Sequence, residues 1–201
     1  MILFTGFEPF GGAAENPSRQ ASSRAAELSR RAGREAVHVE LPCTFEGARA
    51  VLAAAVAEHR PGVIVCAGLA DGRERISLER VALNLIDARI PDNAGAQPVD
   101  VPVEEGAPLA LPTRLPVKRA AARLTEAGLP AELSLSAGSY VCNTVFYAAL
   151  RLAPADVSAG FVHVPPAAAV PIGEQARALE LIAATAWEGE AELRVPGGSE
   201  Y

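Results

Sequence analysis

The feature that most constrains the fold is an unbroken run of five apolar residues, Val63-Ile64-Val65-Cys66-Ala67. A strand that is apolar throughout, rather than alternating, is typical of one covered on both faces. A second apolar run, Met1–Phe7, leads into a loop rich in Gly and Pro. Strands of this kind need helices on both sides of their sheet, so the pattern predicts an α/β fold.

Predicted strands and helices alternate along most of the chain. Helices are expected at 17–32, 45–59, 117–127, 142–152 and 172–187, and strands at 1–7, 36–43, 63–67, 75–86, 131–136 and 159–164. This order predicts a central, largely parallel sheet with helices on both faces. Residues 90–116, rich in Pro, Gly and Asp, are expected to form a long surface excursion. We expect one domain over 1–187 and a frayed tail over 188–201.

Composition excludes several classes of protein. The 201 residues are 50% hydrophobic and 21% charged, which excludes disorder for most of the chain and suits one domain. Acidic residues outnumber basic ones by 24 to 18, so no nucleic-acid-binding surface is expected. No apolar stretch reaches membrane-spanning length, and the N-terminus lacks the features of a signal peptide. We therefore expect a cytoplasmic protein without nucleic acid or membrane partners.

The cysteines and histidines indicate where chemistry could lie. They are Cys43, Cys66, Cys142, His38, His59 and His163. Their spacing fits neither a disulfide framework nor a zinc site, and no metal is expected. Cys142 follows a turn at Gly138 and begins a predicted helix, where amide N–H groups and the helix dipole favour a thiolate and can bind an oxyanion. The other two cysteines lie in apolar strand-like runs and are interpreted as packing residues.

A cysteine nucleophile needs a general base and a group that orients the base. His163 ends a predicted strand, where sheet enzymes place active-site groups, whereas the other histidines are interpreted as strand-face and solvated residues. Glu79 lies in an otherwise apolar strand, so its carboxylate has to be paired there. Spacing alone leaves its partner open. The alternatives to a catalytic histidine are Arg73, Arg75 and Arg80.

Five stretches together form a specific pattern. They are GFEPFGG with the following NPS at 6–18, LPCTF at 41–45, the block GLADGRERISLERVALNLIDARIPDNAGAQP at 68–98, AGSYVCN at 137–143 and FVHVP at 161–165. In type, order and separation they resemble the pyroglutamyl peptidase type I family of cysteine peptidases, over residues 1 to about 187. The resemblance implies a three-layer α/β/α sandwich around a twisted, largely parallel (mixed) sheet, often assembled as a tetramer.

The resemblance also implies an activity and a set of site residues. It implies removal of N-terminal pyroglutamate from peptides by thiolate attack and an acyl-enzyme intermediate, without a metal or organic cofactor. The implied triad is Glu79, Cys142 and His163, and Arg89 matches an arginine implicated near the oxyanion site. The positions that match the pyroglutamyl pocket are Phe7, Phe10, Ile90, Tyr140 and Val141.

Two stretches depart from the family pattern, Leu-Ser-Leu-Ser at 133–136 and the alanine-rich segment at 166–171. Both bear on the leaving group or on oligomer contacts, and neither removes a triad residue. Two alternatives stay open. One is another thiol amidase or esterase on the same scaffold, with a retuned pocket. The other is a non-catalytic small-molecule-binding protein of that fold, against which the intact triad argues.

Overall fold

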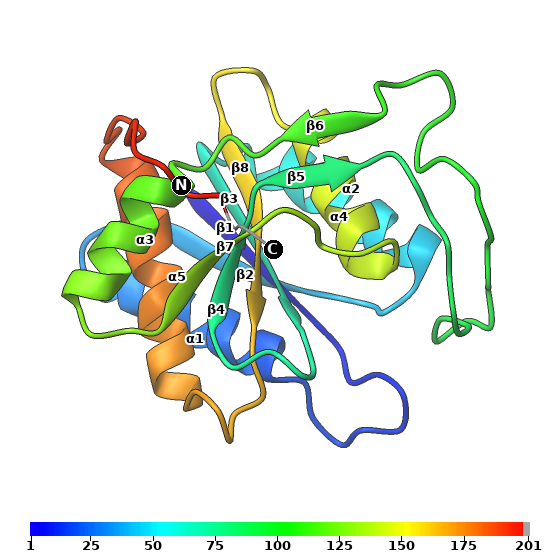
Figure 1. Cartoon of the computed structure of the whole chain (residues 1–201), viewed down its shortest axis with the longest axis horizontal. Helices are drawn as coiled ribbons and strands as arrows, with labels where there is room; N and C mark the ends of the chain where they lie inside the picture. The colour runs from blue at the N-terminus through cyan, green and yellow to red at the C-terminus, as the bar shows by residue number, and fades with distance from the viewer. Residues whose placement is uncertain (199–201) are drawn as a thin grey trace.

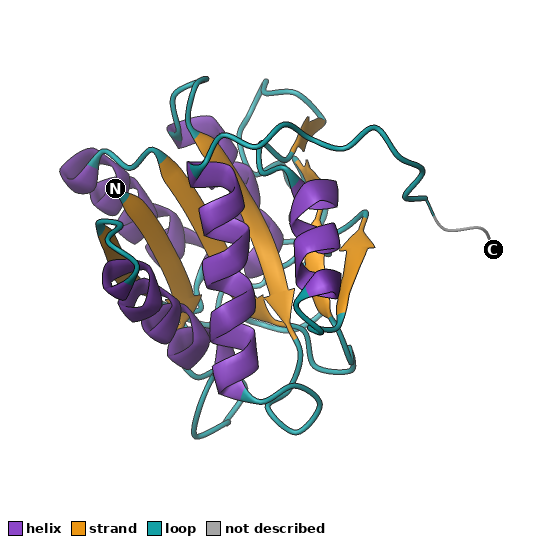
Figure 2. Ribbon diagram, turned by 90° about the vertical axis from the view of Figure 1, so that its left-hand side faces the viewer, coloured by secondary structure: helices purple, strands orange, loops and turns teal. Residues whose placement is uncertain are grey.

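The computed structural model describes residues 1–198 and shows a six-stranded sheet between two layers of helices (Figures 1 and 2). Its strands are β1 (Ile2–Phe7), β2 (Ala36–Leu41), β3 (Val63–Leu69), β4 (Ile76–Glu79), β7 (Ala131–Ser134) and β8 (Ser158–Val164). They lie in the order β2-β1-β3-β8-β4-β7, and each neighbouring pair is parallel except β8 and β4. The expected sandwich around a largely parallel, mixed sheet is confirmed.

The helices divide between the two faces of the sheet. The first face is covered by α1 (Pro17–Arg31), α3 (Val117–Glu126) and α5 (Ile172–Trp187), and the second by α2 (Phe45–His59) and α4 (Val141–Leu152) (Figure 2). In β3, Val63 and Val65 pack against the first group, whereas Ile64 and Cys66 pack against the second. This burial on both faces explains the unbroken apolar run. None of the helices within residues 1–198 combines the length and apolar character that a membrane crossing requires.

A small second sheet departs from the expectation of a single strand over 75–86. The chain leaves β4 at Arg80 and continues as β5 (Val81–Leu83), which pairs antiparallel with β6 (Ala110–Pro112). The strand β6 lies inside the 90–116 excursion, whose composition did not predict it. Because β5 packs against α4, the base of the excursion is held beside the helix that begins near Cys142 (Figure 1).

The start of α1 follows the capping pattern that its sequence predicts. The side-chain oxygen of Asn16 accepts a hydrogen bond from the amide of Ser18 at 3.1 Å, and Pro17 occupies the first helical position. The amide nitrogen of the Asn16 side chain donates to the carbonyl of Glu8 at 3.0 Å. One side chain thus fixes both the helix and the loop that follows β1.

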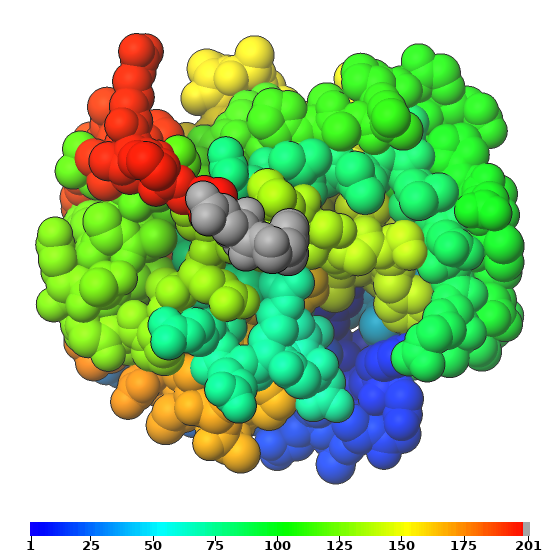
Figure 3. All heavy atoms as spheres, viewed as in Figure 1, coloured from blue at the N-terminus to red at the C-terminus, as the bar shows by residue number. Residues whose placement is uncertain are grey.

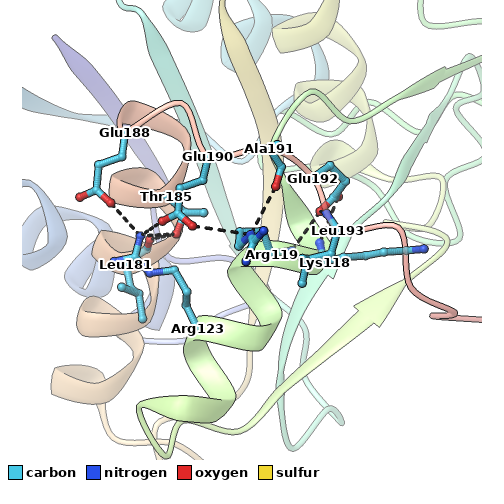
Figure 4. A network of polar contacts seen from close by, with 10 residues as sticks. All are labelled: Lys118, Arg119, Arg123, Leu181, Thr185, Glu188, Glu190, Ala191, Glu192 and Leu193. Carbon is cyan, nitrogen blue, oxygen red and sulfur yellow. Dashed lines mark hydrogen bonds and ion pairs between the residues drawn. The ribbon is translucent and has the colours of Figure 1, made fainter.

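The segment after α5 lies along α3 (Figure 4). The Glu192 carboxylate accepts hydrogen bonds from the backbone amides of Lys118 at 3.1 Å and Arg119 at 2.9 Å. The ion-paired side chains of this network are Arg119, Arg123, Glu188 and Glu190. The sequence predicts a frayed tail over 188–201. The described part of the tail contacts α3 without forming helix or strand, and 199–201 lie outside the described residues.

Replacement of Glu192 by alanine is expected to lower the free energy of unfolding by about 1 kcal/mol. The N-cap residue of α3 is Pro116, which makes no side-chain cap, so the Glu192 carboxylate satisfies the amides of Lys118 and Arg119 in its place. Urea unfolding measures the change. Glu27→Ala, at an exposed position of α1, is the control and should change stability by less than about 0.5 kcal/mol. Equal losses in the two variants would contradict a capping role.

Candidate active site

Glu79 and His163 meet on the face of the sheet that α4 covers. In the antiparallel pairing of β4 with β8, Ser77 lies opposite His163, so Glu79 is the diagonal neighbour of the imidazole. Glu79 Oε1 lies 2.7 Å from His163 Nδ1, and the two side chains are 0% and 6% exposed. The alternation of β4 produces this arrangement, because Ile76 and Leu78 pack on the opposite face. The structure therefore places these two predicted residues in direct contact.

Glu79 also pairs with an arginine. Arg73 Nη1 lies 2.8 Å from Glu79 Oε1, the same oxygen that contacts His163. Within residues 1–198, neither Arg75 nor Arg80 forms an ion pair with this carboxylate. The two interpretations that spacing left open, a histidine partner and an arginine partner, are both present at once.

Cys142 is the second residue of α4, and its sulfur lies against β3. A Cβ atom added at Gly68 would sit 2.8 Å from Cys142 Sγ and 2.8 Å from the Phe161 ring. Gly68 is the register partner of His163, and the Phe161 ring stands edge-on to the imidazole with centroids 4.9 Å apart. Thiol and imidazole thus share the same neighbours. No hydrogen bond joins them in the described part of the chain, and catalytic contacts of this kind often tighten only when substrate binds.

Burial controls the protonation of the nucleophile candidate. Removal from water raises the pKa of the Cys142 thiol, and the nearby Cys43 and Glu79 raise it further, against an opposing effect of Arg73. A helix start alone predicts a lowered pKa, so the net direction is opposite to the sequence-based expectation. This direction favours the protonated thiol, so attack requires a base that takes the proton.

The first turn of α4 presents free amide groups. The helix begins after Tyr140, which makes no side-chain cap, in contrast to α1 with its capping Asn16. Uncapped N–H groups at a helix start can bind an oxyanion. The helix is held in place by Asn143, which is fully buried, accepts from the amide of Leu83 at 2.9 Å and donates to the carbonyls of Leu83 and Leu85. Asn143 is not among the site residues that the sequence predicts.

A cavity of about 220 Å³ opens beside the Cys142 side chain. Three of the predicted pocket residues, Phe7, Phe10 and Tyr140, line it together with Cys142, and the rings of Phe10 and Tyr140 lie 5.5 Å apart. On the face shown in Figure 3, the surface is hollowed between the blue N-terminal loop and the green excursion. The other lining residues, which were not predicted, are Ala13, Glu15, Asn16, Cys43, Leu69 and Asp71.

Besides the Glu79–His163 pair, three predicted site residues are absent from the lining of this cavity, and their roles stay predictions. Val141 is buried in the core between α4 and the sheet, whereas the next residue of the helix, Cys142, faces the cavity. Ile90 is 39% exposed, and Arg89 is exposed. The wall is completed by Leu69 and Asp71, which lie at and just beyond the end of β3. Their place after the carboxyl end of a strand is the signal that could have identified them.

The other thiols and one histidine have clear structural settings. Cys66 is fully buried in the core, and burial raises the pKa of its thiol to about 12, in line with a packing residue. Burial raises the pKa of the Cys43 thiol to about 12 as well. Cys43 also lines the cavity, so it is more than the packing residue that the sequence predicts. His38 lies on β2, and burial lowers its pKa to about 4.

Comparison with known proteins agrees with this geometry. A family model described as pyroglutamyl peptidase matches residues 1–185. The pyrrolidone-carboxylate peptidase of Gloeobacter violaceus is 51% identical over 82% of this chain and 80% of its own, and that of Bacillus subtilis is 38% identical over 98% and 97%. The crystal structure of pyroglutamyl peptidase I from Bacillus amyloliquefaciens superposes with a TM-score of 0.88 at 37% identity, covering 96% of this chain and 98% of its own. The chain belongs to the pyroglutamyl peptidase family.

Proposed function

We propose that this chain is a cysteine exopeptidase that removes N-terminal pyroglutamate from peptides. The observation that carries the proposal is the position of Cys142, on the wall of a small cavity and beside the bonded pair of His163 and Glu79. The relatives named above are pyrrolidone-carboxylate peptidases, which supports the same activity here.

The cavity suits a small neutral ring. A pyroglutamyl residue is a lactam without a free α-amine, so its pocket needs apolar walls and a few backbone hydrogen bonds rather than a buried carboxylate. The aromatic rings of Phe7, Phe10 and Tyr140 supply such walls. Its volume of about 220 Å³ is below the roughly 300–1,000 Å³ of pockets for drug-sized ligands. The two lining carboxylates, Glu15 and Asp71, belong to exposed residues, which places them at the mouth.

In the proposed mechanism, Cys142 Sγ attacks the carbonyl carbon that joins pyroglutamate to the next residue. His163 Nε2 takes the thiol proton, since Nδ1 faces Glu79 Oε1 at 2.7 Å and is assigned the N–H. Glu79 holds this tautomer and stabilises the imidazolium that forms. The amides of the first turn of α4 bind the oxyanion.

The intermediate then collapses. The C–N bond breaks, His163 returns the proton to the departing amine, and pyroglutamate remains as a thioester on Cys142. A water molecule, deprotonated by His163, attacks the thioester and releases pyroglutamate with the thiol restored. We extend the proposal to Arg89 as support for the oxyanion. Hydrogen bonds between Asp87 and Ser139, and from the Tyr140 hydroxyl to the Pro91 carbonyl, hold the segment around Arg89 beside the start of α4.

We also propose a cytoplasmic homo-oligomer, a tetramer by family resemblance. All three cysteines are free, which fits a reducing compartment. The excursion exposes the apolar side chains of Val99, Val101 and Leu109, which are available to contact another copy. Light scattering of the purified protein tests the assembly.

The activity is tested with a pyroglutamyl arylamide, from which the protein is expected to release the dye. A prolyl arylamide, which lacks the lactam carbonyl, should be a poor substrate. Another thiol amidase would cleave the prolyl arylamide faster or cleave neither arylamide. Iodoacetamide at neutral pH should label one thiol, at Cys142, because His163 can take its proton, and the labelling should abolish turnover. A folded protein that releases no dye and whose three thiols react equally slowly would favour the non-catalytic alternative.

Replacement of Glu79 by glutamine is expected to lower kcat by about 10²–10⁴-fold, because the amide cannot stabilise the imidazolium and can reverse the tautomer. The loss should be smaller than that from removing the nucleophile. Steady-state kinetics with the arylamide measures it. Glu74→Gln, at an exposed loop position, is the matched control and should retain the wild-type rate. A Glu79→Gln enzyme with wild-type kcat would remove Glu79 from the mechanism.

A further inference from the structure

We propose that Arg73 is a positioning residue of the reaction, which keeps the Glu79 carboxylate ionised and directed at His163. The inference rests on the proposed function, because it assigns a part in that chemistry to a residue outside the triad. Arg73 lies in the loop between β3 and β4, and its side chain is 30% exposed.

The contacts of Arg73 join three parts of the site. Its Nη1 lies 2.8 Å from Glu79 Oε1, which in turn lies 2.7 Å from His163 Nδ1. Its Nη2 donates to the carbonyl of Ser136 at 3.3 Å, in the turn that leads to Cys142. One guanidinium therefore connects the carboxylate of the proposed triad to the segment that presents the nucleophile.

The burial of Glu79 makes a cation necessary. The side chain is 0% exposed, both of its donors fall on Oε1, and Oε2 has no partner among the described residues. An ionised carboxylate in such a place is stable only if it is paired. While His163 is neutral, as a general base must be, the imidazole donates a hydrogen bond but no charge.

The charged and titratable groups around Glu79 can be compared by element. The β3–β4 loop supplies Arg73, β8 supplies His163, and α4 supplies Cys142, whose thiol pKa is raised by burial. On β7, the carboxyl group of Glu132 accepts a hydrogen bond from the Ser77 hydroxyl at 2.6 Å. Of these groups, Arg73 is the permanent cation, so it is the one that offsets the Glu79 charge.

Loss of the Arg73 guanidinium should make the active protonation state, with Glu79 ionised and His163 neutral, less populated. Without it, either Glu79 takes up a proton or His163 holds one more tightly, because the carboxylate charge is no longer shared. Both outcomes remove the form with ionised Glu79 and neutral His163. The acidic limb of the kcat/KM profile therefore moves to higher pH, which a purely structural role would not produce.

The experiment compares Arg73→Gln and Arg73→Lys with the wild type, using pH profiles of kcat/KM on the pyroglutamyl arylamide. Arg73→Gln is expected to lower kcat/KM at neutral pH by roughly 10- to 100-fold and to raise the acidic limb by about one pH unit. Arg73→Lys keeps the charge, so the limb should stay at its wild-type pH. Arg75→Gln, an exposed neighbour in the same loop, is the control and should match the wild type throughout.

A second comparison keeps the proposal testable if Arg73→Gln unfolds. In the Glu79→Gln background the buried carboxylate charge is gone, so Arg73 has no charge to offset there and adding Arg73→Gln should not lower kcat further. A wild-type limb in Arg73→Gln, or a further loss of kcat in the double variant, would overturn the proposal. A wild-type protein without dye release would instead overturn the proposed function, and the two failures are therefore distinct.

Discussion

Cys142→Ser is expected to lose dye release from a pyroglutamyl arylamide by roughly 10⁴-fold or more. A serine hydroxyl is a far weaker nucleophile than a thiol and is harder to deprotonate. Burial already raises the pKa of the thiol at this position, so even the wild-type thiol needs a base to take its proton. The loss should appear in kcat, with binding retained, because the cavity walls are unchanged.

Two variants control for the presence of the other thiols. Cys66→Ala removes a fully buried sulfur from the core, and it should cost stability while leaving kcat near the wild-type value. Cys43→Ser changes a residue on the cavity wall, so its effect should fall mainly on KM. If Cys142→Ser turned over normally while one of these variants did not, the nucleophile would be wrongly assigned.

Local sequence signals were sufficient for most of the helices. The helix expected at 45–59 has these bounds in the structure, because alanine-rich periodicity and the stop at Pro61-Gly62 act over a few residues. The break of the 75–86 strand at Arg80 was not predictable in this way. It depends on β4 pairing with β8 and β5 pairing with β6, which are contacts between distant parts of the chain.

In the candidate site too, some residues could be predicted from local sequence and others depend on contacts between distant parts of the chain. Cys142 and His163 could be selected from position alone, one after a turn and the other at a strand end. The partner of Glu79 could not, because three arginines lie within six residues of it and only the path of the β3–β4 loop selects Arg73. The cavity position of Cys43 was missed for a related reason, since an apolar strand end looks the same whether it faces the core or a cavity.

Gly68 is a site residue that sequence reasoning had no means of finding. It lies within β3 rather than in a turn, and its backbone is not in the left-handed region that favours glycine. Glycine is required here because a side chain would clash with its neighbours, not because the backbone conformation demands it. An added Cβ would lie 2.8 Å from both Cys142 Sγ and Phe161 Cζ, closer than side chains pack.

Gly68→Ala is therefore expected to lower kcat/KM by roughly 100-fold, because displacement of a reacting group by about 1 Å has an effect of this size. The extra methyl group should also lower the free energy of unfolding by about 1–3 kcal/mol, since it overfills a packed site. Arylamide kinetics and urea unfolding measure the two effects separately. The loss should be concentrated in kcat, because Phe7, Phe10 and Tyr140 still form the pocket.

Gly173→Ala is the matched control, since the same methyl group added there, in the first turn of α5, meets no atom within 4 Å. It should leave kcat unchanged and stabilise the protein by about 0.4–1 kcal/mol. Alkylation of Cys142 by iodoacetamide separates displacement of the sulfur from loosening of the fold. In folded Gly68→Ala the rate of alkylation should change together with kcat, because both depend on where Sγ sits relative to His163. A folded Gly68→Ala enzyme with wild-type kcat would show that the sulfur does not react from its position against β3, and the geometry that joins Cys142 to His163 would need revision.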